Sequence, residues 1–215
     1  MKITVFSAKG GVGKTPISTN IAFDRDCLIA TNDEYHGFSV LKRITDEDRC
    51  LVVAPNDEFP TIPDDMDVVF DLGGTLSGGS APSIRSAITQ SDLVIVPVPN
   101  ETKAIISTVH TINEVAEINK NILLVATKLK RTGNENSLHP WNLSKEFLRI
   151  KEMIEAMTEK EWPMLPLKLS AGFDAIFEQE KSLRELVDGG GIDAYNYALP
   201  AHQFDEIYEY ISGKK

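Results

Sequence analysis

The eight residues AKGGVGKT at positions 8–15 constrain the fold of this chain more than any other segment. They follow a short apolar run, ITVF, and precede Ile17, Ile21 and Ala22, whose spacing is typical of a helix. The glycines allow backbone N–H groups to turn toward an anion without a Cβ clash, and a helix start adds partial positive charge. A strand, a glycine loop and a helix in this order predict a phosphate-binding P-loop.

In a P-loop the lysine before the final hydroxyl residue contacts the β and γ phosphates, and that hydroxyl ligates Mg²⁺. Lys14 and Thr15 occupy these two positions. The residues expected to bind the nucleotide here are Gly10, Gly11, Val12, Gly13, Lys14, Thr15 and Pro16. The sequence therefore predicts ATP and Mg²⁺ as ligands.

Apolar runs of strand length alternate along the chain with segments of helical period. The expected strands are 2–7, 27–31, 50–54, 67–72, 93–98, 122–127 and 164–168, and the expected helices are 14–23, 81–90, 101–118, 143–160, 173–187 and 201–212. Most of the strand runs are continuously apolar, as in a parallel sheet covered on both faces. This pattern predicts an α/β three-layer P-loop NTPase fold, with a mostly parallel, doubly wound sheet of about seven strands in a single domain, 1–215.

Residues 9–15, KGGVGKT, resemble the motif of the deviant Walker A ATPases, the ParA and MinD group of partition and positioning ATPases. The resemblance implies that Lys9 is the family's signature lysine, which reaches the phosphates of the partner's ATP in a nucleotide-sandwich dimer. The sequence departs from the family at Pro16, where a threonine or serine is usual, so one backbone N–H and one hydroxyl are missing. The first turn of a helix tolerates proline best. We expect a lower nucleotide affinity or a changed loop conformation, but not the loss of binding, because most of the phosphate cradle is glycine backbone and Lys14.

Further site residues are expected from the same resemblance. Asp71 ends the run DVVFD and resembles the family's Walker B carboxylate, which holds a water of the Mg²⁺ shell. Residues 32–37, NDEYHG, stand where the family has its first switch, with Glu34 favoured over Asp33 as the carboxylate that polarises the attacking water. The poor match at this switch predicts slow hydrolysis. Lys128 and Pro166 are expected beside the base.

The resemblance implies an ATP-dependent dimerising ATPase for plasmid or chromosome partition, stimulated by a centromere-binding or other partner protein. The alternatives are a positioning ATPase for another cargo, a nucleotide-binding adaptor with weak catalysis, and a P-loop tyrosine kinase. Four of the five tyrosines, Tyr195, Tyr197, Tyr208 and Tyr210, lie in the last 21 residues, as in such kinases. Packing of an aromatic C-terminal helix also accounts for them.

The net charge of −10 argues against a dedicated nucleic-acid binder. Residues 120–151 nevertheless carry seven basic and two acidic side chains within an acidic chain. A DNA-binding patch could be formed by Lys120, Lys128, Lys130, Arg131, Lys145, Arg149 and Lys151, with Asn134, Asn136 and Trp141 adding contacts. A solvated loop and helix face would have the same composition.

Apolar runs such as LVIVPVP at 93–99 are far shorter than the ~20 residues of a membrane-spanning helix. The last helical segment has an apolar stripe, but Asp205, Glu206 and Glu209 would be repelled by anionic lipid. Neither a secretory signal nor a membrane-inserting helix is expected. The sequence therefore predicts a cytoplasmic protein, associated with the nucleoid if it binds DNA.

Overall fold

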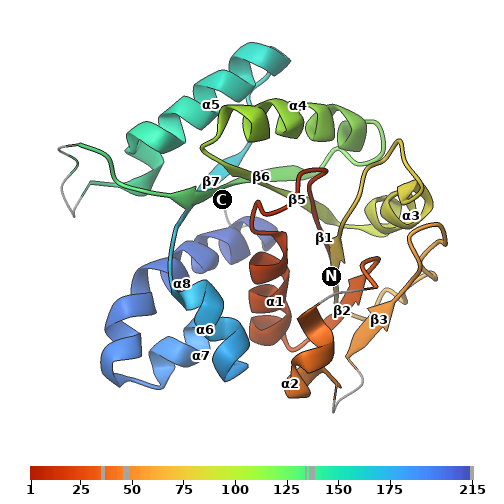
Figure 1. Ribbon diagram of the computed structural model, residues 1–215, viewed down its shortest axis with the longest axis horizontal. Helices are drawn as coiled ribbons and strands as arrows, with labels where there is room; N and C mark the ends of the chain where they lie inside the picture. Colours follow the sequence, from red (N-terminus) through yellow and green to blue (C-terminus); the bar gives the residue numbers. More distant parts are fainter. Residues whose placement is uncertain (35–36, 46–48, 134, 136–138, 214–215) are drawn as a thin grey trace.

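A computed structural model describes residues 1–34, 37–45, 49–133, 135 and 139–213. Its centre is one seven-stranded sheet with the order β3-β2-β4-β1-β5-β6-β7, in which all pairings are parallel (Figure 1). The strands are β1 (Lys2–Phe6), β2 (Leu28–Thr31), β3 (Cys50–Val52), β4 (Val68–Leu72), β5 (Leu93–Pro99), β6 (Ile122–Leu129) and β7 (Met164–Lys168). The expectation of a parallel α/β sheet of about seven strands is confirmed.

Helices cover both faces of the sheet, which gives three layers (Figure 1). One face is covered by α3 (Ala81–Gln90), α4 (Thr102–Ala116) and α5 (Lys145–Thr158). The other is covered by α1 (Lys14–Arg25), α2 (Lys42–Thr45), α6 (Gly172–Gln179), α7 (Leu183–Asp188) and α8 (Gly191–Ile211). Two short 3-10 helices, η1 (Gly37–Val40) and η2 (Trp141–Leu143), lie in connecting segments.

The continuously apolar strands result from this double cover. In β5, Leu93 and Ile95 point to the core under α1 and α8, whereas Val94 and Val96 point to the core under α4 and α5. Successive side chains of a strand face opposite sides of a sheet, so both sets must be apolar when both sides are covered.

The C-terminal helices differ most from the sequence expectation. Segment 173–187 is two helices, because Glu180 adopts a left-handed conformation at the end of α6 and Ser182 begins α7 with a capping box to Glu185. Helix α8 begins at Gly191, ten residues before the expected start, and contains Pro200 within it. A proline usually ends a helix, so a sequence reading placed the boundary at this point.

Among the described residues, no helix is long and apolar enough to span a membrane.

Candidate nucleotide-binding site

The glycine loop leaves the carboxyl end of β1, a central strand of the sheet, and leads directly into α1 (Figure 1). In open parallel sheets, ligands bind outside the carboxyl ends of the strands, where the connections diverge to opposite sides. Gly11 has a φ of 70° and Gly13, the residue before α1, has a φ of 103°. Both values lie in the region that side chains disfavour, so the loop conformation itself requires these two glycines.

Lys14 lies partly buried in this loop. Its Nζ is 3.4 Å from the backbone oxygen of Lys9. Burial lowers the pKa of the Lys14 ammonium below its ordinary value, and the negative charges of Asp71 and Asp33 oppose that shift. A partly buried cation is poorly solvated, so it interacts more strongly with a bound anion than an exposed cation would. Phosphate binding uses such an interaction.

Thr15 and Asp71 meet at the base of the loop. The Thr15 hydroxyl donates to Oδ2 of Asp71 at 2.8 Å. The other oxygen, Oδ1, is buried and has no hydrogen-bond partner among the described residues, although the nearby Ser18 hydroxyl lowers the pKa of the Asp71 carboxyl. Burial raises the pKa of the Asp71 carboxyl to about 6, against the opposing effects of the Thr15 hydrogen bond and the Lys14 charge.

A hydroxyl and a buried carboxylate with one unsatisfied oxygen fit the needs of a hydrated magnesium ion. Mg²⁺ retains several of its waters and prefers oxygen ligands. Thr15 could supply a direct ligand, and Oδ1 of Asp71 could accept a hydrogen bond from a water of the ion's shell. The donor set of Thr15 and Asp71 therefore agrees with the predicted metal site.

Pro16 is the third residue of α1. The amide of a residue in the first helical turn has no acceptor within its helix, so a proline there removes no helical hydrogen bond. The next amide, of Ile17, donates to the Gly13 oxygen at 3.4 Å. The loop therefore accommodates Pro16.

Asn32 joins the carboxyl ends of β2 and β4. Its Nδ2 donates to the oxygen of Gly73 at 2.9 Å and to Oγ of Ser83 at 2.9 Å, and its Oδ1 accepts from the amide of Gly73 at 2.8 Å. Asn32 is 3% exposed. Asn32, the first residue of the segment 32–37 that resembles the first switch, is thus buried and links the ends of two strands.

The two candidate carboxylates of the switch differ in their electrostatic relation to the site. The charge of Asp33 acts on both Lys14 and Asp71, where it raises the pKa of each group. Among the described residues, Glu34 has no such effect on either group. Asp33 is therefore the one of the two carboxylates whose charge reaches the phosphate-binding lysine. Which of them orients a water stays a prediction. Tyr35 and His36 of the same segment lie outside the described residues.

Lys128 ties the end of β6 to the glycine loop. Its Nζ donates to the Gly11 oxygen at 2.7 Å, and the neighbouring Thr127 hydroxyl donates to the Val12 oxygen at 2.8 Å. Lys128 has a φ of 56°, and the pairing of β6 with β7 is irregular between Ala126 and Leu129. A non-glycine residue in this conformation is strained, and such strain concentrates at functional sites.

A cavity of about 190 Å³ adjoins the loop beside Lys128. It is lined by Gly13, Pro16, Ile17, Thr127, Lys128, Leu167, Leu169, Ser170, Phe173 and Asp174. Half of the lining residues have apolar side chains, as a nucleotide base would need: Pro16, Ile17, Leu167, Leu169 and Phe173. We name it the base cavity.

The structure places Pro166 away from the base cavity. Pro166 lines a separate cavity with Arg131 and Trp141, while Leu167 lines the base cavity. Adjacent residues of β7 point to opposite faces of the sheet, so only one of the pair can face the glycine loop. Pro166 thus does not line the cavity beside the glycine loop, whereas Leu167, Leu169 and Phe173, which the sequence analysis did not single out, do. No short motif marks them. Which residues contact the base stays a prediction.

Lys9 forms an ion pair with Glu101, the residue before α4. The distance from Nζ of Lys9 to Oε2 of Glu101 is 2.7 Å, and both side chains are substantially exposed. This interaction lowers the pKa of the Glu101 carboxyl. In the single chain the expected signature lysine thus points to a carboxylate of its own subunit.

The basic residues of segment 120–151 lie in different parts of the structure. Lys120 precedes β6 and Lys128 is near its end, so the two lysines lie at opposite edges of the sheet. Lys151 pairs with Glu155 and Glu161 at 3.5 and 2.9 Å. The seven residues therefore do not form one patch.

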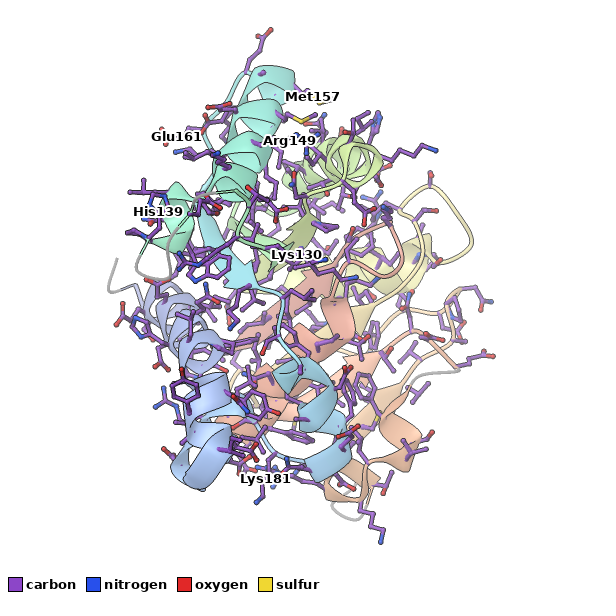
Figure 2. The ribbon with its side chains drawn as sticks, turned by 60° about the vertical axis from the view of Figure 1, so that its left-hand side comes forward. Lys130, His139, Arg149, Met157, Glu161 and Lys181 are labelled. Atoms are coloured by element: carbon purple, nitrogen blue, oxygen red, sulfur yellow. The ribbon has the colours of Figure 1, made fainter. Side chains whose placement is uncertain are left out.

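The basic side chains near the nucleotide edge are arranged differently. Arg149 donates to Thr102 Oγ1 at 2.9 Å and to the side chain of Asn100. Figure 2 shows Lys130 and Arg149 on the same side of the molecule. Arg131 lies over the ring of Trp141, 4.8 Å from its centre. Asn134 and Asn136 lie outside the described residues.

The apolar side chains along one face of α8 pack into the protein core. Phe204 and Ile207 are at most 1% exposed. Tyr208 is also buried, and its hydroxyl donates to Oδ2 of Asp24 at 2.6 Å. Tyr195, by contrast, is 87% exposed. Packing thus explains Tyr208 but not Tyr195.

No protein-family model matches the chain, and no curated protein matches it in sequence. Solved structures do match its fold. A McdA variant from Cyanothece in complex with ATP is 14% identical, with a TM-score of 0.64, and the match covers 99% of this chain and 96% of that one. MinD from Pyrococcus horikoshii in complex with Mg-ADP is 12% identical, with a TM-score of 0.60 and 97% of both chains covered.

A putative plasmid partition protein from Borrelia burgdorferi bound to AMPPNP is 13% identical, with a TM-score of 0.56, and the match covers 97% of this chain and 98% of that one. These similarities extend over nearly the whole length of each chain. They show that the chain has the fold of the ParA and MinD P-loop ATPases.

Proposed function

We propose that this chain is an ATP-dependent switch of the partition and positioning type, which hydrolyses ATP and forms a dimer in its ATP-bound state. The observation that carries this proposal is the Thr15–Asp71 pair at the base of the glycine loop, in which Oδ1 of Asp71 is buried and accepts no hydrogen bond from the part of the chain that the structure describes. Such a pair suits a nucleoside triphosphate bound together with a divalent cation.

The loop residues bind and orient the triphosphate. Backbone N–H groups of residues 10–13 surround the phosphates, and Lys14 places positive charge where negative charge accumulates during phosphoryl transfer. Mg²⁺, when bound by Thr15 and the waters that Asp71 orients, would neutralise phosphate charge. The protein's contribution is therefore positioning and electrostatics.

Asp33 orients the attacking water. Its charge already acts on Lys14 and Asp71, so it belongs to the same electrostatic unit as the phosphate site. Asn32 fixes the end of β2 against Gly73 and thereby limits where Asp33 can move. Glu34 would lie at the surface of the same segment and take no part in hydrolysis.

Lys9 acts across the dimer. Lys9 lies in the glycine loop, but its ammonium forms an ion pair with Glu101. An exposed ion pair of this kind contributes little free energy to stability. Leaving Glu101 for the phosphates bound to a second subunit therefore meets little resistance. Additional positive charge at the transferred phosphoryl group stabilises the transition state.

The cargo of the switch is the finer part of the proposal. Solved structures of similar fold include a putative plasmid partition protein, McdA in complex with ATP, and the septum site-determining protein MinD. Non-specific DNA is the candidate surface, contacted by Lys130, Lys145 and Arg149 near the nucleotide edge. A centromere-binding or other partner protein would stimulate hydrolysis and release the dimer.

Light scattering with and without ATP and Mg²⁺ tests the proposal. We expect a monomer without nucleotide and a dimer with it, and no dimer for Lys14→Ala, which removes the phosphate-binding ammonium. Lys42→Ala is the matched control, because Lys42 lies on α2 outside the site. A wild-type protein that stays monomeric with ATP would overturn the switch.

The same measurement with non-specific duplex DNA tests the cargo. Binding that requires ATP and weakens steeply as salt rises supports DNA, since neutralising phosphates releases counterions. An ATP-dependent dimer that does not bind DNA at low salt would contradict the proposed DNA surface. It would leave the proposal of an ATP-dependent switch unaffected.

A further inference from the structure

The N-terminal half of α8 exposes three large apolar side chains. Ile192, Tyr195 and Leu199 are 75%, 87% and 37% exposed. Their spacing of three and four residues places them on one side of the helix, where they are neighbours. We name these three side chains the α8 face. It shares no residue with the base cavity or the glycine loop.

Core packing does not account for the α8 face, because the opposite side of the same helical segment supplies the core. Tyr197 packs against the buried cluster and Pro200 is itself buried. Residues 191–201, GIDAYNYALPA, contain a single charged side chain, Asp193. A helix that is apolar nearly all round is normally buried on all sides. Figure 1 shows the start of α8 at the margin of the molecule, beside α6 and α7. The composition of this segment therefore indicates a partner from outside the chain.

The α8 face is held firmly by the neighbouring helix α6. A Cβ atom at Gly172 would lie 2.9 Å from Cδ1 of Tyr197, so the two helices are in close contact at this glycine. At the start of α8, Nε2 of Gln179 donates to Oδ2 of Asp193 at 3.4 Å. A surface that is already ordered loses little conformational entropy when a partner binds.

Three carboxylates lie beside the α8 face. Glu178 is near the end of α6, Asp188 ends α7, and Asp193 follows Ile192 in the first turn of α8. None of these carboxylates forms an ion pair within the described part of the chain. The basic side chain of the same region is Lys181, so the surroundings of the α8 face keep an excess of negative charge.

The charge and the aromatic ring select the kind of partner. Negative charge attracts a basic surface, whereas it repels DNA phosphates, anionic lipid headgroups and the equally acidic face of a second copy of this chain. The exposed ring of Tyr195 offers its face to a lysine or arginine, and tyrosine is enriched at protein interfaces.

We propose that the α8 face is the docking site for a basic amphipathic helix of a partner protein. The apolar side of that helix covers Ile192, Tyr195 and Leu199, and its lysine or arginine side chains pair with the three carboxylates. Exposed apolar patches with a polar rim mark such interaction sites, and helices bind them through residues at helical spacing.

A defined peptide tests the proposal without nucleotide. The probe is a fluorescein-labelled helical peptide with leucine along one side and lysine along the other, and its anisotropy should rise in a saturable manner with protein concentration. The affinity should fall as salt is added. The counterpart with glutamate in place of lysine should bind at least tenfold more weakly.

Variants connect the binding to the α8 face. Tyr195→Ser and Ile192→Ser should each weaken binding of the lysine peptide about tenfold or more, the usual size for a central apolar contact. Met157→Ser is the matched control, because Met157 is an exposed apolar residue of α5, 45% accessible. It should bind the peptide like the wild type. Circular dichroism checks that the helices of each variant are intact.

The carboxylates are tested together. Glu178→Gln combined with Asp188→Asn should weaken binding of the lysine peptide and reduce its salt dependence. Equal binding of the lysine and glutamate peptides, or unchanged affinity in both Tyr195→Ser and Ile192→Ser, would overturn the proposal.

Two other occupants of the α8 face are excluded by the same variants. A nucleotide-free dimer that Tyr195→Ser dissociates would show that a second copy covers the face. Tighter binding to phosphatidylglycerol vesicles than to the lysine peptide, lost in Tyr195→Ser, would show that a lipid surface does. Either result would overturn the proposal. None of these measurements involves ATP, so a failure of the α8 face is distinct from a failure of the proposed switch.

Discussion

The hydroxyl of Thr15 donates to the carboxylate of Asp71 at 2.8 Å, although the two residues are 56 positions apart in the chain. The contact exists because β1 and β4 are parallel neighbours, with Val5 paired to Asp71, so that both strands end at the same edge. The glycine loop and the buried carboxylate are thereby brought together at one place.

Replacing Lys9 should separate nucleotide binding from turnover. Lys9→Ala should bind a fluorescent ATP analogue like the wild type, since Lys14 and the loop backbone remain, but should lose dimer-dependent hydrolysis. Glu101→Gln should leave ATP-dependent dimerisation nearly unchanged, because the exposed Lys9–Glu101 pair contributes little free energy. Hydrolysis rates measured against protein concentration check both. Wild-type turnover in Lys9→Ala would refute the role of this lysine.

Asp71 should make the stability of the metal-free protein depend on pH. Its pKa is about 6 in the folded chain against 3.8 as the ordinary value, so the folded form holds a proton that the unfolded form has lost between these values. The free energy of unfolding should therefore fall by about 3 kcal/mol as pH rises from about 4 to about 6, and then stay level.

Asp71→Asn should remove this fall and leave the protein more stable at neutral pH. The same variant should lose the Mg²⁺ dependence of nucleotide affinity, since it cannot present a charged oxygen. Urea unfolding in the presence of a chelator, at several pH values, measures the stability. A wild-type protein whose stability does not fall over this range would contradict the burial of an ionised Asp71.

Asp33 and Glu34 should differ in their effect on hydrolysis. Asp33→Asn should lower the rate about 100-fold, a typical loss for a group that orients a reacting water. Glu34→Gln should leave the rate within a factor of about two, because the charge of Glu34 does not act on Lys14 or Asp71. Single-turnover hydrolysis measures both variants. The opposite order would restore Glu34 as the functional carboxylate.

Lys128 and Glu159 offer a matched pair of strained residues. Both have a positive φ, 56° and 53° respectively. Glu159→Gly should raise the free energy of unfolding by about 1 kcal/mol, because glycine adopts this conformation without a Cβ penalty.

Lys128→Gly should gain less stability, since it also loses the hydrogen bond from Nζ to the Gly11 oxygen, and nucleotide should bind roughly tenfold more weakly. Thermal unfolding and nucleotide titration of the two variants check this contrast. Equal nucleotide affinity in Lys128→Gly and Glu159→Gly would show that the Lys128 contact does not support the loop.

Local patterns determined which elements form and where the phosphate loop lies. Continuous apolar runs predicted each of the seven strands, because a strand covered on both faces must be apolar at every position. The glycine loop was evident because its backbone conformation needs glycine at Gly11 and Gly13. Boundaries failed where a local rule was overridden, as at Pro200 inside α8.

Only the tertiary structure decided how distant groups meet. Three features each depend on a neighbour far away in the sequence. They are the cavity that Pro166 lines, the hydrogen bonds between Asn32 and Gly73, and the ion pair of Lys9 with Glu101. The separate cavity that Pro166 lines is of the same kind, since Arg131 and Gln203, which also line it, are 72 residues apart in the chain. Sequence periodicity reports the environment of a residue along its own element, whereas such contacts depend on how the elements pack against one another.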